Sequence, residues 1–294
     1  MPSPALKRAA FKSRISRSPI FRFPVGRDAC PVKAPADGRP LRGVPVERCT
    51  IEQSAIAYWE IGLRVGEPVS QNKNGPLLGH VYDLLGPSRD GHPSYRAYHT
   101  SAEINYLSGF CDVVGLLCLR KSRSGGQSKI VTTVAVYNAI LRRRPDLAAE
   151  LLKPWYIDRR EEIPPGKKPW FEMPVFCFSE EYFSTNWHNY YVETAQRFDE
   201  LLRFTESQIE ALDMLDQITE ELRCDMIFEP GTFSFCAITW RPTDGRSIRI
   251  GPSPSANGIC CAYGWQPPVA GRWSTKFWNA MSISSPASAR PAFA

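Results

Sequence analysis

The segment EINYLSGFCDVVGLLCLRKSRSGGQSKIV, residues 103–131, is the part of the chain from which the fold is best predicted. Residues 112–119 are too few and too continuously apolar for a surface helix, and they are typical of a strand that is buried on both faces. Ser124, Gly125 and Gly126 predict a turn. Residues 129–136, rich in Val and Thr, then predict the returning strand.

Two helices carry clear start signals. Thr50 and Gln53 have the spacing of a capping box, so a helix is expected over residues 54–63, with Gly66 near its end. Thr205 and Gln208 repeat the signal. The second helix is expected to bury one apolar stripe, formed by Ile209, Leu212, Leu215, Ile218 and Leu222.

The rest of the chain is less regular. Residues 137–152 are expected to be helical with an interruption at Pro145, and residues 154–176 form a proline-rich loop before a strand near 171–178. Short strands with helices between them predict a mainly β fold with flanking helices (α+β). A double-stranded β-helix, or jelly roll, is the best match.

Three regions are expected. Residues 1–41 form a basic, poorly ordered segment, residues 42–231 form the folded domain, and residues 232–294 form an atypical tail. The tail shows neither helical nor alternating periodicity, so the β-core is expected to be incomplete at its C-terminal strands.

Composition limits the classes of partner. The chain has 294 residues, 43% of them hydrophobic, and no apolar run of the length that crosses a bilayer, so no membrane association is expected. The net charge of +6 arises largely in residues 1–27, which contain no acidic residue, so a solvated surface is favoured over a nucleic-acid-binding face. Nine cysteines without paired C-x-x-C spacing predict reduced thiols in a cytoplasmic protein and no structural zinc.

The basic start permits other interpretations. Its Arg- and Ser-rich, acid-free composition is also that of a mitochondrial transit peptide.

A set of fragments along residues 42–231 resembles the taurine dioxygenase-like (TauD/TfdA-like) family of Fe(II)/2-oxoglutarate-dependent oxygenases. The fragments are RGVPVE, IAYWEIGLRVGEPVSQN, LLGHVYDL, YHTSAEINY, CDVVGLLCLRKSRSGGQS, VYNAILRRRPDL, PWYIDRR, KKPWFEMPVF, YYVETAQRF and FEPG. The resemblance implies a jelly-roll oxidoreductase that acts on a small-molecule substrate. It also implies Fe(II) held by two histidines and a carboxylate, with 2-oxoglutarate as cosubstrate.

The metal ligands that the resemblance implies are absent. Such enzymes have an H-[TS]-D motif just before the strand, and here Leu107 replaces the histidine and Gly109 replaces the aspartate. Neither side chain has a lone pair for a metal ion. The second family histidine should follow FEPG, but the last histidine of the chain is His188. No metal site is therefore predicted, and oxygenase activity is expected to be impaired or absent.

Neighbouring donors are poor substitutes. His99 and Asp112 flank the motif, but a strand that points residue 107 inward points residue 112 to the other face. The remaining histidines, His80, His92 and His188, are more typical of structural or surface groups.

Part of the implied pocket is retained. Ser128 lies where the family usually has a hydroxyl that binds 2-oxoglutarate, and Gln71 and Asn72 lie in a segment implied to line the same pocket. A hydroxyl at a strand start and a polar turn explain these residues equally well. Four aromatic residues can frame a substrate mouth or can pin the proline-rich loop: Trp155, Tyr156, Trp170 and Phe171.

Two functional hypotheses remain. The first is a 2-oxoglutarate-dependent dioxygenase by descent that has lost activity, and the second is a non-catalytic protein that keeps the fold and binds a small anion. A frame offset offers one origin for the mismatched ends. If the codons from Gly231 onward are read with the third base of one codon and the first two bases of the next, the permitted sequence includes the family's His-Gly-Arg-Thr. The same offset makes the basic N-terminal segment similar to the family sequence.

Overall fold

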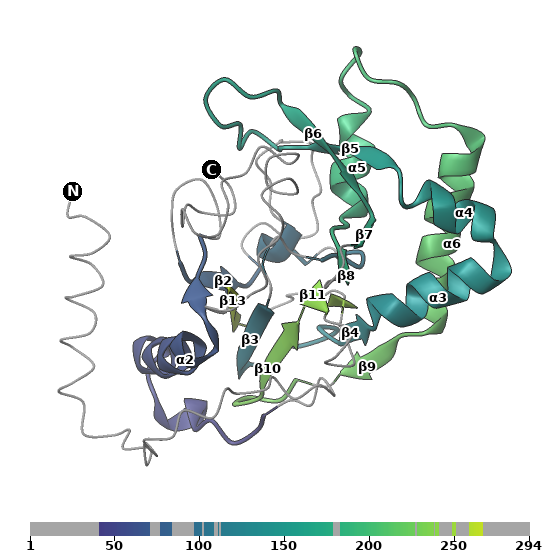
Figure 1. Ribbon diagram of the computed structural model, residues 1–294. Coiled ribbons are helices and arrows are strands. Elements are labelled where there is room, and N and C mark those ends of the chain that lie inside the picture. The colour runs from purple at the N-terminus through teal and green to yellow at the C-terminus, as the bar shows by residue number, and fades with distance from the viewer. Residues whose placement is uncertain are drawn as a thin grey trace.

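The computed structural model describes part of the chain. The described residues are 41–70, 77–83, 97–101, 103–108, 111, 113–178, 183–226, 228–237, 239–240, 249–250 and 259–266. Figure 1 shows short strands at the centre, one long helix on one side of them and several helices on the other. The centre of the molecule is therefore a β-core between helices.

The largest sheet is built around the strand that the sequence predicts. β3 (Val113–Arg120) pairs on one side with β10 (Phe233–Ala237) and on the other with β13 (Ile259–Gln266), both antiparallel. β1 (Glu67–Pro68) and β2 (Gly79–Val81) both pair with β13. The predicted buried strand is confirmed, because all but two of its residues are buried.

The central sheet continues beyond the boundary expected at residue 231. Phe233 and Cys236 of β10 are both fully buried, and Phe233 lies opposite Leu117 of β3. The sequence of β10 lacks alternation because both of its faces pack against protein. This burial explains why periodicity gave no strand signal there.

α2 (Ile51–Val65) covers one face of this sheet and begins at the predicted capping box. Thr50 and Gln53 exchange both capping hydrogen bonds, and the helix ends before Gly66. The hydroxyl of Tyr58 donates to the carbonyl of Gly115 in β3 at 2.7 Å. The expected first helix is confirmed, and its contact with the sheet is specific.

The predicted returning strand is shorter than expected. β4 (Ser128–Val131) pairs with β9 (Cys224–Met226) and β12 (Arg249–Ile250), and the chain then enters α3 (Thr133–Arg143). The side chain of Thr132 accepts a hydrogen bond from the backbone N–H of Ala135 at 3.2 Å. The strand prediction for residues 132–136 is therefore wrong, because this N-cap overrides the β-propensity of Val and Thr.

Two further sheets are small. β7 (Phe176–Phe178), β8 (Phe183–Thr185) and β11 (Thr239–Trp240) form one, and β5 (Pro154–Asp158) pairs with β6 (Trp170–Pro174) in the other. The proline-rich loop predicted for residues 154–176 is thus largely a β-hairpin. Its prolines lie at strand ends or between strands, where a missing N–H costs little.

The helices on the other side form the second layer. α3 and α4 (Pro145–Glu150) pack on α6 (Glu206–Glu221), and α5 (Asn189–Ala195) packs on β5. α6 has the predicted capping box, and Leu215 and Ile218 are fully buried. Ile209 is 48% exposed, so the predicted apolar stripe is buried only in its middle.

The architecture is a mixture of helix and strand, as expected in outline. The described strands form small antiparallel sheets and do not by themselves close a jelly roll. Among the described residues, no helix combines the length and the apolar character that a bilayer span requires.

Candidate functional site

Leu107, the position at which the sequence predicts a lost metal ligand, lies in the short segment before β3. The backbone of Leu107 forms an isolated antiparallel bridge with His188, and its side chain is partly buried. Next to it, the N–H of Ser108 donates to the carbonyl of Trp187 at 2.8 Å, and the N–H of Trp187 donates to Oγ of Ser108 at 2.7 Å. Gly109 lies outside the described residues. Residue 107 is thus held by backbone pairing, and its own side chain is a hydrocarbon.

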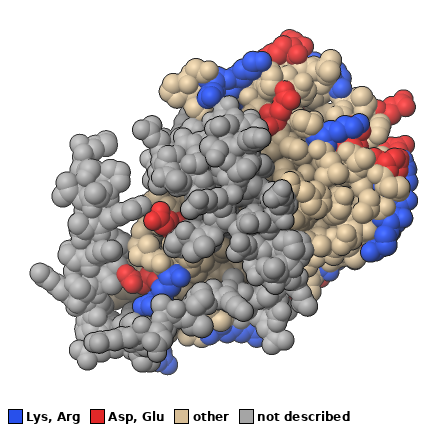
Figure 2. Space-filling model, in the orientation of Figure 1, with Lys and Arg blue, Asp and Glu red and all other residues tan. Residues whose placement is uncertain are grey.

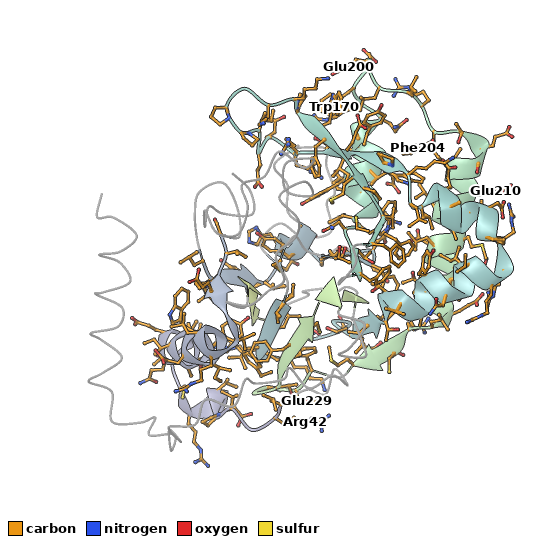
Figure 3. The ribbon with its side chains drawn as sticks, in the orientation of Figure 1. Arg42, Trp170, Glu200, Phe204, Glu210 and Glu229 are labelled. Atoms are coloured by element: carbon orange, nitrogen blue, oxygen red, sulfur yellow. The ribbon has the colours of Figure 1, made fainter. Side chains whose placement is uncertain are left out.

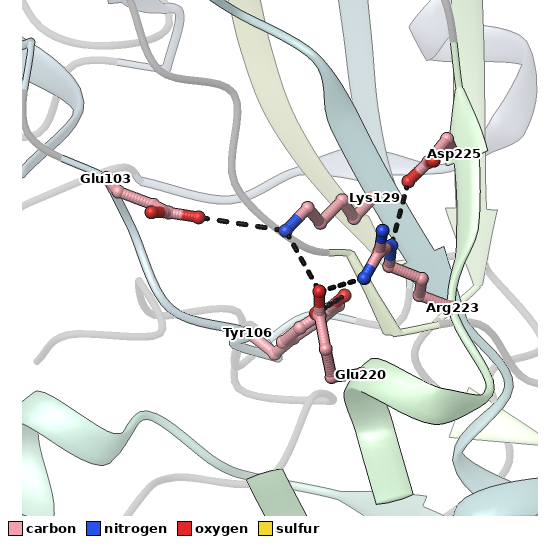
Figure 4. Close-up of polar contacts among 6 residues, drawn as sticks. All are labelled: Glu103, Tyr106, Lys129, Glu220, Arg223 and Asp225. Carbon is pink, nitrogen blue, oxygen red and sulfur yellow. Dashed lines mark hydrogen bonds and ion pairs between the residues drawn. The ribbon is translucent and has the colours of Figure 1, made fainter. Parts of the chain in front are cut away.

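A polar network flanks this segment. Figure 4 shows its members, Glu103, Tyr106, Lys129, Glu220, Arg223 and Asp225. The hydroxyl of Tyr106 donates to Oε2 of Glu220 at 2.8 Å. Glu220 also forms ion pairs with Arg223 and, at 3.3 Å, with Lys129. The network ties residues 103–106 to the end of α6, to β4 and to β9.

The network shifts the ionisation of its members. Burial, reinforced by the hydrogen bond to Glu220, raises the pKa of the Tyr106 phenol well above its ordinary value. The hydrogen bond from Tyr106, together with that from Lys129, lowers the pKa of the Glu220 carboxyl. The structure therefore favours a neutral phenol bonded to a charged carboxylate.

The described histidines do not converge on residue 107 as a metal centre. The ring of His99 packs edge-on against Tyr98, with centroids 4.4 Å apart, and His80 lies in β2 opposite Cys261. The ring of His188 stacks on Tyr191 at 4.0 Å. His92 and Asp112 lie outside the described residues. Within the described part of the chain, no group of three His, Cys, Asp or Glu side chains is placed to hold a metal ion. The donor set of the described residues does not fit Fe(II).

Ser128 is buried at the start of β4. Only 1% of its surface is exposed, and its Oγ has no hydrogen-bond partner among the described residues. Ile130, two residues on, lies on the same face of the strand and packs against the cluster of Leu116 and Phe228. Ser128 thus faces the interior between β3 and β4. Gln71 and Asn72, predicted to line the same pocket, lie outside the described residues.

The four aromatic residues of the hairpin have different environments. Trp155 is buried in the main core, where its Nε1 donates to the carbonyl of Glu150 at 3.3 Å. Trp170 is partly exposed, and its Nε1 donates to Glu200 at 3.1 Å. Both residues are labelled in Figure 3. The ring of Tyr156 packs edge-on against Trp170 with centroids 5.2 Å apart. Trp155 therefore packs inside the core as part of β5.

Phe171, the fourth aromatic residue, is partly buried against the core. The guanidinium of Arg159 lies over its ring at 4.7 Å.

A buried charged cluster that was not predicted from the sequence lies near His188. Asp158 and Arg160 are only 1% and 2% exposed, and Asp158 forms a 3.0 Å ion pair with Arg197. The guanidinium of Arg160 lies 4.4 Å from the ring centroid of Tyr190 and 5.4 Å from that of Tyr191. The sequence signal was the fragment PWYIDRR, in which an acid precedes two arginines. Through Tyr191 the cluster reaches the ring of His188, whose backbone pairs with residue 107.

The charges on the visible face are mixed in sign. Figure 2 shows basic and acidic side chains interspersed around the described part of this face, with a broad area that carries neither. An interspersed pattern does not produce the strong positive field that favours nucleic-acid binding. The absence of nucleic-acid binding stays a prediction.

The chain belongs to a family of non-haem iron dioxygenases. Residues 40–236 match the family described as "Taurine catabolism dioxygenase TauD, TfdA family". The match covers the central sheet through β10, the segment at residue 107 and the helices of the second layer. The resemblance predicted from the sequence is confirmed, and the enzymes of this family are 2-oxoglutarate-dependent oxidoreductases.

Curated relatives agree with this assignment. The chain is 30% identical over 200 residues to FR-33289 synthase of Streptomyces rubellomurinus. This alignment covers 65% of the chain and 57% of that protein. It is 26% identical over 203 residues to the taurine hydroxylase-like protein SAT17 of Stachybotrys chartarum. This second alignment covers 66% of the chain and 52% of that protein. The aligned region thus spans just over half the length of these relatives.

Solved structures share the fold at low sequence identity. An asparagine oxygenase in complex with Fe(II), 3-hydroxyasparagine and succinate superposes with a TM-score of 0.51 at 16% identity, covering 89% of this chain and 79% of that one. A mutant of the non-heme iron oxygenase OrfP in complex with (3S)-hydroxy-L-Arg gives a TM-score of 0.51 at 11% identity, covering 80% of this chain and 72% of that one. These similarities support the fold and not a substrate.

Proposed function

We propose that this chain is a 2-oxoglutarate-dependent dioxygenase by descent whose oxidative turnover is impaired. The observation that carries the proposal is Leu107, a hydrocarbon side chain held by backbone pairing at the position where the family motif places a histidine. Gly109 replaces the carboxylate of the same motif. The loss of two of three protein ligands removes the donors on which the facial triad depends.

The proposal extends to the architecture. The small antiparallel sheets of the described residues are proposed to be parts of a jelly roll, since the chain belongs to a family with that core. A cytoplasmic location, with the mitochondrion as the alternative, stays a prediction from cysteine usage and the basic N-terminal composition. Fractionation of cells that express the natural transcript distinguishes the two.

Oxygen consumption tests impaired turnover directly. The purified full chain, supplied with Fe(II), ascorbate and 2-oxoglutarate, is expected to consume no more oxygen and release no more succinate than a heat-denatured sample. A functional family member assayed in parallel shows that the reagents are competent. Succinate release that depends on both Fe(II) and folded protein contradicts the proposal.

A second function is favoured by Ser128. A buried hydroxyl without a hydrogen-bond partner among the described residues carries a desolvation cost that a bound ligand would offset. This fits the alternative of a non-catalytic protein that binds a small anion such as a dicarboxylate. The prime substrate, by contrast, is not specified by any described residue.

Binding without metal distinguishes the second function from the first. Titration of 2-oxoglutarate or succinate into the protein in EDTA is expected to give measurable heat, and Ser128→Ala should weaken binding by roughly tenfold. Ser207→Ala is the matched control, because Ser207 is exposed in the first turn of α6. Equal affinities of the two variants contradict a role of Ser128 in binding.

A further inference from the structure

The segment around residue 107 is anchored on both sides by protein contacts. On one side, Tyr106 is only 8% exposed and belongs to the main core, with its hydroxyl bonded to Glu220 at 2.8 Å. On the other side, Ser108 is 5% exposed and makes two hydrogen bonds to the backbone of Trp187. Residue 107 lies between these anchors, and its own backbone bridges to His188.

The first anchor is reinforced by charge. Glu220 accepts from Tyr106 with one oxygen, and its other oxygen faces Lys129 at 3.3 Å and Arg223. Figure 4 shows that these groups come from separate elements: the segment before β3, β4 and the end of α6 with the turn that follows it. Hydrogen bonds to a charged acceptor are stronger than neutral ones, and the two cations keep the carboxylate charged.

The second anchor is reinforced by packing. Trp187 is 2% exposed, and its ring packs edge-on against Trp155 with centroids 6.1 Å apart. His188, which bridges residue 107, stacks on Tyr191, and the buried guanidinium of Arg160 lies 5.4 Å from that ring. The segment that pairs with residue 107 is therefore itself fixed in the core.

In metal sites the ion usually supplies part of the free energy that orders its ligands. We infer that in this chain Tyr106 and Ser108 have that role as positioning residues, so that the segment at residue 107 keeps a single conformation without a metal ion. This inference rests on the proposed loss of the iron ligands, and it names the two protein contacts that order the segment in place of a metal ion. It predicts a preformed site that a chelator does not loosen.

Hydrogen exchange of the full chain tests this inference. Peptides that cover residues 104–108 are expected to exchange at the same rate in EDTA and in excess Mn(II), because no metal organises them. Tyr106→Phe should increase their exchange by roughly tenfold and lower the Tm by about 2–6 °C. Tyr156→Phe is the matched control, since the Tyr156 hydroxyl makes no hydrogen bond among the described residues, and it should change neither quantity.

Two results overturn the inference. One is slower exchange of residues 104–108 in Mn(II) than in EDTA, which would show that a metal orders the segment. The other is unchanged exchange in Tyr106→Phe. If that variant does not fold, Ser108→Ala is used instead, and unchanged exchange at residues 106–108 is then the contradicting result. Succinate release would contradict the proposed function and leave these exchange rates unaffected, so the two failures are distinguishable.

Discussion

Gly231 lies directly against the backbone carbonyl of Val44. Its φ is +77°, and a Cβ atom built at this position overlaps the carbonyl oxygen of Val44. The N–H of Val44 also donates to the carbonyl of Gly231 at 3.2 Å. This contact joins the start of the family domain to the turn before β10, so the glycine is required both by backbone conformation and by space.

Gly231→Ala is therefore expected to destabilise the protein strongly. The positive φ and the overlap with a backbone atom together should cost about 2–4 kcal/mol. Urea denaturation measures the change as a lower midpoint at constant slope. Gly125→Ala is the control, because Gly125 has φ +68° but no atom near its Cβ position, and it should cost only about 1 kcal/mol. Equal midpoints for the two variants would show that the Val44 contact is unimportant.

The Tyr106–Glu220 pair should give the protein an acid-sensitive contribution to stability. Because the pKa of Glu220 is lowered in the folded state, its contribution is fully present above the unfolded pKa of about 4.3 and is lost as the pH falls through the folded value. Glu220→Gln removes the titrating group. The difference in unfolding free energy between wild type and variant should therefore shrink as the pH falls below about 4.3. A difference that is constant with pH would exclude this linkage.

Thr205 should stabilise α6 through its capping box. Thr205 and Gln208 satisfy each other's backbone N–H groups, at 3.2 and 2.9 Å. Thr205→Ala is expected to lower the unfolding free energy by about 1 kcal/mol, measured by urea denaturation. Ser207→Ala, two residues into the same helix, makes no cap and should change stability by less than about 0.5 kcal/mol. Equal losses of unfolding free energy in the two variants would contradict a stabilising role of this cap.

The described cysteines should differ in reactivity. Burial raises the pKa of the Cys177 thiol to about 12, and that of Cys236 also to about 12. Cys224 is exposed in β9. Because the thiolate is the reactive form, iodoacetamide at neutral pH should label Cys224 in the native protein and reach the other two only after unfolding. Peptide mass spectrometry measures the order in which the three cysteines are labelled. Labelling of Cys236 in the native protein would contradict the buried position of β10.

Transcript sequencing tests the origin of the missing ligands. If the tail is out of frame, the natural transcript should carry an offset of the reading frame near the codon for Gly231 and a second one before residue 42. Uninterrupted in-frame reads across both positions would remove this hypothesis. The predicted loss of the histidine at residue 107 does not depend on this hypothesis, because residues 40–236 match the family in the present frame.

Local signals in the sequence predicted the local structure. The capping boxes at Thr50 and Thr205 define helix starts because their hydrogen bonds join residues three apart. The buried strand β3 could likewise be predicted from its apolar run. The loss of the metal ligand at Leu107 stays a prediction from the sequence. The family could be assigned from ordered fragments alone.

Only the tertiary structure decided the remaining features. The choice between strand and helix after Val131 depended on one cap, and the strand β10 carries no periodicity because it is buried on both faces. Tyr106 and Glu220 are 114 residues apart, so no local pattern predicts their bond. Caps and apolar runs act within a few residues, whereas the contacts that hold residue 107 join segments that meet only when the sheets and helices pack.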